Sequence, residues 1–153
     1  MRVFEFVMTA KPLYIDRSLL NSDMITKWYA DQGFPREHFT KDFHVTVCNS
    51  MEPVDWGKTS QQDNYLVVPA DSNRRMEKYG TATVLAFDHQ PLQSRFNRLL
   101  NSGAHSKFKD YQPHVSLTYK PFEMDLGSLK PYEGPLMFGP ERYKEAVEDF
   151  TPE

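Results

Sequence analysis

Two parts of the chain repeat one order of apolar and polar positions. Apolar and polar residues alternate over 43–47 (FHVTV) and again over 113–119 (PHVSLTY), which predicts two β-strands. Before each strand, apolar residues recur at helical spacing and end at a glycine, Gly33 or Gly103. Each glycine lies eleven residues before the histidine of the strand that follows. The pattern therefore predicts two related strand–helix–strand units within one domain.

The remaining segments complete this plan. The helices are expected to begin near Ser22 and Pro91, a suitable cap and a suitable first-turn residue. A loop is expected over 49–64, and a short helix or irregular connection over 71–80. Apolar or β-branched runs predict further strands, the last of which could equally be helical: 3–8, 65–68, 81–87, 136–138 and 142–147.

The polar faces of the two histidine strands carry matching chemistry. His44 and Thr46 point to one side of the first strand, and His114 and Ser116 to one side of the second. A neutral imidazole can accept a proton from an attacking hydroxyl, while a protonated one donates to a leaving oxygen. The hydroxyls can donate hydrogen bonds to phosphate oxygens. If the two faces meet, they predict a site for phosphodiester cleavage that needs no metal.

A single histidine followed two residues later by serine or threonine is a weak signal. His38-Phe39-Thr40 also matches, in a polar stretch without strand alternation, and is interpreted as a loop. Each strand histidine taken alone is more simply explained as an ordinary sheet residue. Two copies at matched positions favour the active site over that explanation.

Composition narrows the class of function. The chain has 153 residues and a net charge of −3, which argues against binding of long nucleic acid. The single cysteine, Cys48, cannot form a disulfide within the chain, which is compatible with a reducing compartment. It is expected to be a small buried side chain of the core. No apolar run approaches the about 20 residues that span a bilayer, and the N-terminus does not resemble a signal peptide. We expect a cytoplasmic monomer without membrane contact.

The motifs HVTV (44–47) and HVSL (114–117) resemble the paired motifs of the 2H phosphoesterase superfamily. The stretches KPLYIDRSLL (11–20) and KDFHVTV (41–47), the chain length and the Pro- and Gly-rich tail are most similar to the phage anti-CBASS phosphodiesterases. The resemblance implies an α+β, bilobal, pseudo-symmetric fold, in which two antiparallel sheets line a central cleft and the helices lie outside. One lobe would span about 1–70 and the other about 71–153.

The resemblance also implies roles and a substrate. His44 and His114 would be acid and base, and Thr46 and Ser116 phosphate ligands, with no metal and no cofactor. Phage enzymes of this kind degrade the cyclic di- and trinucleotides that signal infection in bacteria. A phage-encoded chain would act in the cytoplasm of the host.

Other residues are weaker candidates for substrate binding, each with a structural alternative. Tyr14 could stack on a base, Phe150 could close over one as a lid, and Glu141 could accept from a base amino group. Basic side chains that could neutralise phosphates are Arg74, Arg75 and Lys120.

The leading hypothesis is cleavage of a 3′–5′ bond in a cyclic oligonucleotide by attack of the 2′-hydroxyl. Two alternatives stay open. One is a related enzyme that acts on RNA ends or on 2′–5′ linked oligoadenylate. The other is a protein that sequesters the cyclic nucleotide without cleaving it.

Overall fold

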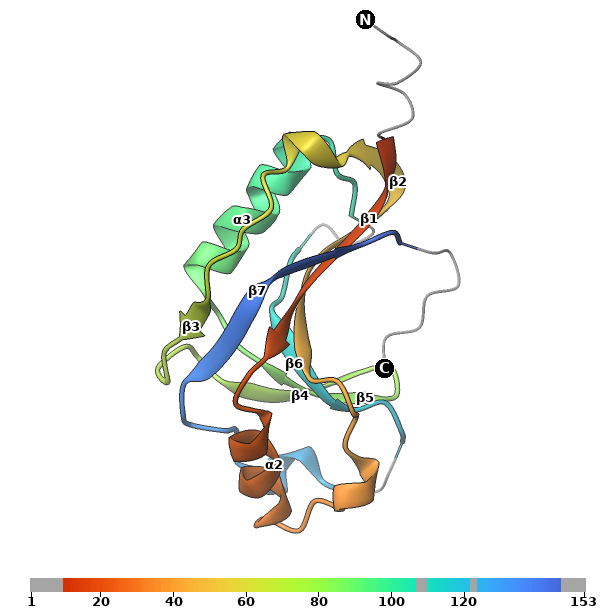
Figure 1. Ribbon diagram of the computed structural model, residues 1–153. Coiled ribbons are helices and arrows are strands. Elements are labelled where there is room, and N and C mark those ends of the chain that lie inside the picture. Colours follow the sequence, from red (N-terminus) through yellow and green to blue (C-terminus); the bar gives the residue numbers. More distant parts are fainter. Residues whose placement is uncertain (1–9, 107–109, 122–123, 147–153) are drawn as a thin grey trace, which may run out of the picture.

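The computed structural model describes residues 10–106, 110–121 and 124–146. These residues form seven strands and two helices (Figure 1). Short 3₁₀ turns lie at Arg36–His38, Trp56–Lys58 and Leu126–Ser128. The strands and helices are, in chain order, β1 (Ala10–Leu19), α2 (Ser22–Ala30), β2 (His44–Asp55), β3 (Leu66–Val68), β4 (Arg75–Tyr79), β5 (Ala82–Ala86), α3 (Gln90–Asn101), β6 (His114–Thr118) and β7 (Leu136–Lys144).

The strands form one antiparallel sheet in the order β3-β7-β1-β2-β6-β5-β4. The two histidine strands, β2 and β6, are neighbours at its centre and pair through Val45 and Val115. This pair joins a four-stranded half to a three-stranded half. The predicted α+β class is confirmed, and the two sheets expected from the sequence are connected into one at this point.

Each helix packs against one half of the sheet. The hydroxyl of Tyr29 on α2 donates to the sulfur of Met76 on β4, at 3.1 Å. Helix α3 contacts β2 and buries Leu92, Phe96 and Leu99. In Figure 1, α3 therefore lies along the half that contains β1, β2 and β7, and α2 lies near β4 and β5.

Chain segments cross between the two sequence halves. Strand β7 comes from the C-terminal half yet pairs with β1, for example Ile15 with Tyr143. The division into lobes near residue 70 stays a prediction. The four-stranded half of the sheet combines strands from both ends of the chain, whereas β4, β5 and β6 all come from its C-terminal half.

Most elements match the sequence predictions, but three segments differ. The expected strand over 3–8 lies outside the described residues, and the observed β1 begins at Ala10. Strand β2 continues to Asp55, so the loop predicted from residue 49 is wrong over that part. Pairing of β2 with β1 along this length stabilises an extended chain despite its polar residues.

The segment 75–79 is strand β4, where a helix or irregular connection was expected. It pairs with β5 over its whole length and forms the edge of the sheet, where polar residues are tolerated. The two predicted strands near the C-terminus are one strand, β7, which excludes the helical alternative for 142–144.

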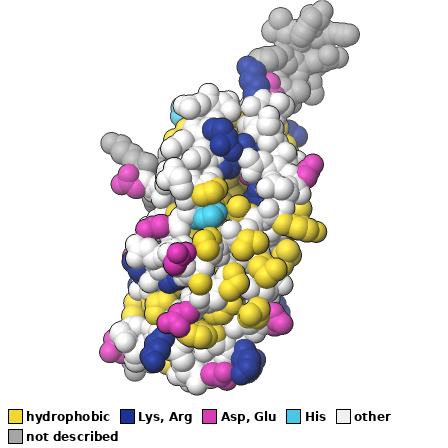
Figure 2. Space-filling view, turned by 90° about the vertical axis from the view of Figure 1, so that its left-hand side faces the viewer, with side chains coloured by type: hydrophobic (Ala, Val, Ile, Leu, Met, Phe, Trp, Pro, Cys, Tyr) yellow, Lys and Arg dark blue, Asp and Glu magenta, His cyan; other side chains and the backbone are white. Residues whose placement is uncertain are grey.

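Large apolar side chains remain exposed on the opposite edge of the sheet, at β3 and β7. Figure 2 shows hydrophobic side chains gathered on the face that carries α3 and β3. Tyr65, Val67 and Met137 are exposed by 70%, 55% and 42%. No helix among the described residues is long and apolar enough to cross a membrane. This edge lies at the opposite end of the sheet from β4.

Candidate active site

The four motif residues line one cleft of about 370 Å³. Val45 and Val115 are fully buried on the core side, so the residues that flank them face the other side. Because the strands are antiparallel, this register brings His44 toward Ser116 and Thr46 toward His114. The lining residues are His44, Thr46, Tyr79, Thr81, Ala82, His114, Ser116 and Tyr119.

Both imidazoles are held in the same way. Nδ1 of His44 donates to the backbone carbonyl of Asp42 at 2.9 Å, and Nδ1 of His114 to that of Gln112 at 3.0 Å. A carbonyl can only accept, so the proton of each neutral ring is on Nδ1. Nε2 of each ring is then the atom that can exchange a proton with a ligand in the cleft.

The surroundings of the two histidines differ. Burial lowers the pKa of His114, and the charge of a protonated His44 lowers it further. Nδ1 of His44 lies 3.7 Å from a carboxylate oxygen of Asp42, whereas the neutral side chain of Gln112 brings no such charge to His114. The lowered pKa favours a neutral ring at His114, which is the form that can accept a proton.

Thr46 is fixed by two tyrosines. Its Oγ1 is 2.8 Å from the hydroxyl of Tyr14, and its carbonyl accepts from Tyr111 at 2.7 Å. Tyr14 is only 3% exposed, so its ring presents little surface for the base stacking that the sequence suggested. The structure places Tyr14 behind the cleft as a partner of Thr46.

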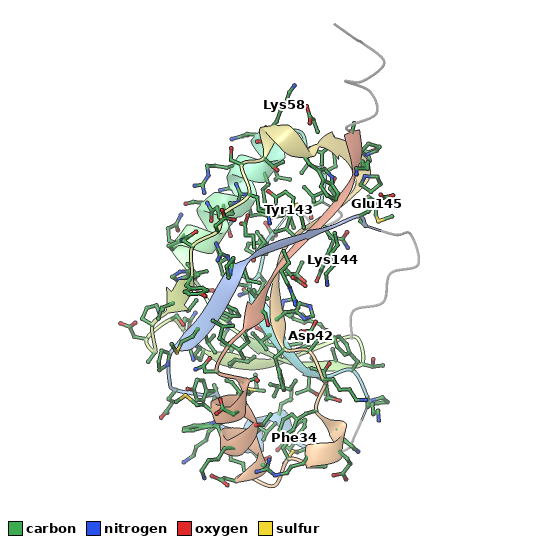
Figure 3. The ribbon with its side chains drawn as sticks, in the orientation of Figure 1. Phe34, Asp42, Lys58, Tyr143, Lys144 and Glu145 are labelled. Carbon is green, nitrogen blue, oxygen red and sulfur yellow. The ribbon has the colours of Figure 1, made fainter. Side chains whose placement is uncertain are left out.

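A charged cluster lies next to His44. Arg142 donates to both carboxylate oxygens of Asp16, at 2.7 and 3.0 Å, and lies 3.5 Å from Asp42. Figure 3 shows Asp42 and Lys144 on the same side of β1, with Tyr143 on the α3 side. Ligand atoms of Asp16, Asp42 and His44 all lie within 4.8 Å of one another, close enough to hold a metal ion. The guanidinium of Arg142 already supplies positive charge to the two carboxylates.

Two other predicted substrate contacts are corrected. Glu141 is 3% exposed and accepts from Nε and Nη2 of Arg95, both at 2.8 Å, so its carboxylate cannot meet a base. Arg74 donates to Ser72 and to the carbonyls of Pro69 and Tyr132. Both side chains are occupied by structural partners, which the sequence pattern could not show.

Arg75 also lies away from the cleft lining. It donates to Gln112 Oε1 at 2.7 Å and pairs with Glu77 and Asp88. Its guanidinium thus supports the residue whose carbonyl holds His114. Lys120 is exposed next to Tyr119, and its role as a phosphate contact stays a prediction. Phe150 lies outside the described residues.

Sequence reasoning missed the other cleft residues, from the β4–β5 hairpin and the end of β6. The two-residue turn Gly80-Thr81, which joins two extended segments, could have predicted this hairpin. Cys48 is buried as expected, and burial raises the pKa of its thiol to about 11. A protonated thiol is a poor nucleophile.

Comparisons with known proteins agree with the motifs. The relative "Anti-CBASS protein Acb1" of Caulobacter sp. (strain RHG1) is 39% identical over 144 residues, which cover 90% of this chain and 23% of the relative. The protein of that name from Escherichia phage RB16 is 33% identical over 89 residues, 57% of this chain and 50% of the relative. This chain thus spans about a quarter of the Caulobacter protein and half of the phage protein.

The fold has solved counterparts. E. coli LigT complexed with 3′-AMP superposes with a TM-score of 0.57 at 14% identity, over 90% of this chain and 96% of that chain. A likeness at this identity shows the fold. At the level of sequence, the family model described as "Anti-CBASS protein Acb1" matches residues 11–153. The chain therefore belongs to the family of anti-CBASS protein Acb1.

Proposed function

We propose that this chain is a metal-independent phosphodiesterase that cleaves 3′–5′ bonds of cyclic di- or trinucleotides, and so removes the signal of antiphage defence in the host bacterium. The main observation is the matched geometry of the imidazoles. Both donate Nδ1–H to a backbone carbonyl, and both line one cleft together with Thr46 and Ser116. Membership of the Acb1 family supports the substrate class.

The proposed reaction is a transesterification, in which one phosphoester bond forms as another breaks. Neutral His114 takes the proton of the ribose 2′-hydroxyl through Nε2, and the 2′-oxygen attacks the neighbouring phosphorus. The bond from phosphorus to the 5′-oxygen breaks, and protonated His44 gives that oxygen its proton. The product is a linear oligonucleotide with a 5′-hydroxyl and a 2′,3′-cyclic phosphate. No water is consumed in this step, so substrate and product have equal mass.

The two hydroxyls stabilise the transition state in this scheme. Thr46 and Ser116 donate to the non-bridging oxygens, where negative charge accumulates. The cleft volume lies near the lower end of the range for small-molecule sites. It suits the scissile phosphate and a flanking nucleoside, with the rest of the cyclic molecule outside.

The decisive experiment follows products of cyclic di- and trinucleotides by chromatography and mass analysis in EDTA. A new species of unchanged mass, or heavier by one water after ring opening, is expected. The matching 2′-deoxy substrates should stay intact, and His44→Ala and His114→Ala should each abolish cleavage while the melting temperature is kept. Loss of turnover on chelation would contradict the mechanism.

The same assay separates the alternatives. Intact nucleotide released after denaturation indicates a protein that only sequesters its ligand. Faster turnover of linear RNA ends or of 2′–5′ oligoadenylate indicates the related enzyme class. Either result would replace the proposed substrate.

A further inference from the structure

The cleft residues outside the two motifs form an uncharged wall that contains two tyrosines. Tyr79, Thr81 and Ala82 come from the β4–β5 hairpin, and Tyr119 follows β6 directly. Within the part of the chain that the structure describes, no lysine or arginine belongs to the cleft lining. Affinity for a nucleotide must then depend strongly on uncharged contacts.

The ring of Tyr79 is held beside the catalytic imidazole. Its centroid lies 4.9 Å from that of His114, and the two ring planes meet at 81°. Tyr79 is the last residue of β4 and pairs with Ala82 across the turn. Thr81 Oγ1 donates to the carbonyl of Tyr119 at 2.9 Å, which ties the hairpin tip to the end of β6. The ring is therefore positioned before a ligand arrives.

Space for a flat group lies next to this ring. Ala82 lines the cleft opposite Tyr79 in the strand register, and its methyl group fills little of the volume there. A larger residue at this position would occupy the space. A nucleobase is flat, and stacking of one base on an aromatic side chain strengthens binding by about fivefold to 150-fold.

We infer that Tyr79, Thr81 and Ala82 form a nucleobase subsite beside His114, which takes the base next to the scissile phosphate. The inference rests on the proposed function, because it needs a nucleotide phosphate between the two histidines. It adds a specificity-determining contact that the histidine motifs do not contain. Tyr79 stacks on the base, while Ala82 keeps the stacking space open.

The test measures binding of 2′-O-methyl cyclic di-AMP by calorimetry in EDTA, since the blocked 2′-oxygen cannot attack. Tyr79→Leu should weaken binding by about tenfold or more, whereas Tyr79→Phe keeps the ring and should bind within about twofold of wild type. Ala82→Leu keeps the ring but fills the space and should bind as weakly as Tyr79→Leu. Tyr65→Leu makes the same change on the exposed β3 edge and should leave affinity unchanged.

The outcomes separate the subsite from the proposed reaction when unblocked cyclic di-AMP is assayed in parallel. Full affinity in Tyr79→Leu and Ala82→Leu, with cleavage by wild type, would overturn the subsite alone. Weak binding in both variants without cleavage by wild type would support the subsite and refute the reaction. Equal losses in Tyr65→Leu, or a wild type that binds no cyclic di-AMP, would overturn the subsite as well.

Discussion

The two catalytic histidines obtain their orientation from the backbone. Each Nδ1 donates to the carbonyl two residues earlier, at Asp42 and Gln112, so the side chains of those residues are not needed for the contact. A backbone carbonyl two residues before the start of each strand is enough to fix which nitrogen carries the proton. The side chains instead distinguish the two sites, because only Asp42 brings a carboxylate near the ring.

The pH dependence of activity should reflect His114. Burial lowers the pKa of its imidazole below the ordinary value of about 6.5, and the base must be neutral to accept a proton. We therefore expect kcat/KM to rise as pH increases through this lowered pKa. Tyr79→Leu admits water to the imidazole and should move the rising limb to higher pH. A wild-type limb above the ordinary histidine value would contradict the assignment of His114 as base.

Tyr14 should act on catalysis through Thr46. In Tyr14→Phe the ring remains in the core, but Thr46 loses its 2.8 Å partner. A hydrogen bond of this kind is worth about 1 kcal/mol, so we expect a fall in kcat of about fivefold with little change in KM. The matched control is Tyr132→Phe, which removes another largely buried hydroxyl, whose sulfur contact is 4.0 Å long. Equal kcat in the two variants would argue against a positioning role.

Local patterns of apolar and polar residues predicted the strands that carry the histidine motifs, but not all of the neighbouring strands. Helix α3 and strand β6 follow from apolar spacing, a proline at the helix start and strict alternation. Strand β1 was not predicted because it buries two charged residues, Asp16 and Arg17. These side chains depend on partners far along the chain, such as Arg142 and Gly139. Edge strand β4 was not predicted because its stability comes from pairing with β5.

The β4–β5 turn links backbone strain to the cleft. Gly80 has φ +63°, a conformation that costs other residues about 1 kcal/mol or more. Gly80→Ala should lower stability by about that amount and also raise KM, because the turn positions Tyr79. Gly33→Ala, at φ +98° after α2 and with nothing near its added Cβ, should lower stability without affecting KM. Thermal melting and kinetics of both variants test this, and unchanged KM in Gly80→Ala would refute the link.

At the scale of the whole molecule, the two halves of the sheet are held together by long-range contacts. The motif residues of the cleft were predictable because each lies within a local pattern. The burial of Glu141 was not predictable, because it depends on Arg95, which lies 46 residues earlier on α3. The same ion pair joins α3 to β7, and Arg95 also donates to the carbonyls of Thr59 and Ser60.

This buried network makes a prediction that distinguishes a structural Glu141 from a base-binding one. Glu141→Gln leaves the guanidinium of Arg95 without its carboxylate, with only 6% of that side chain exposed, and should cost about 3–5 kcal/mol of unfolding free energy. Replacing both partners by apolar residues should recover only part of the loss. The backbone N–H of Gln62 would still lose the Glu141 carboxylate, and the hydroxyl of Tyr143 would keep only Thr59 as a partner. Denaturant unfolding measures the loss, and kcat/KM per folded molecule should stay near wild type. A stable Glu141→Gln variant with raised KM would instead restore the base contact suggested by the sequence.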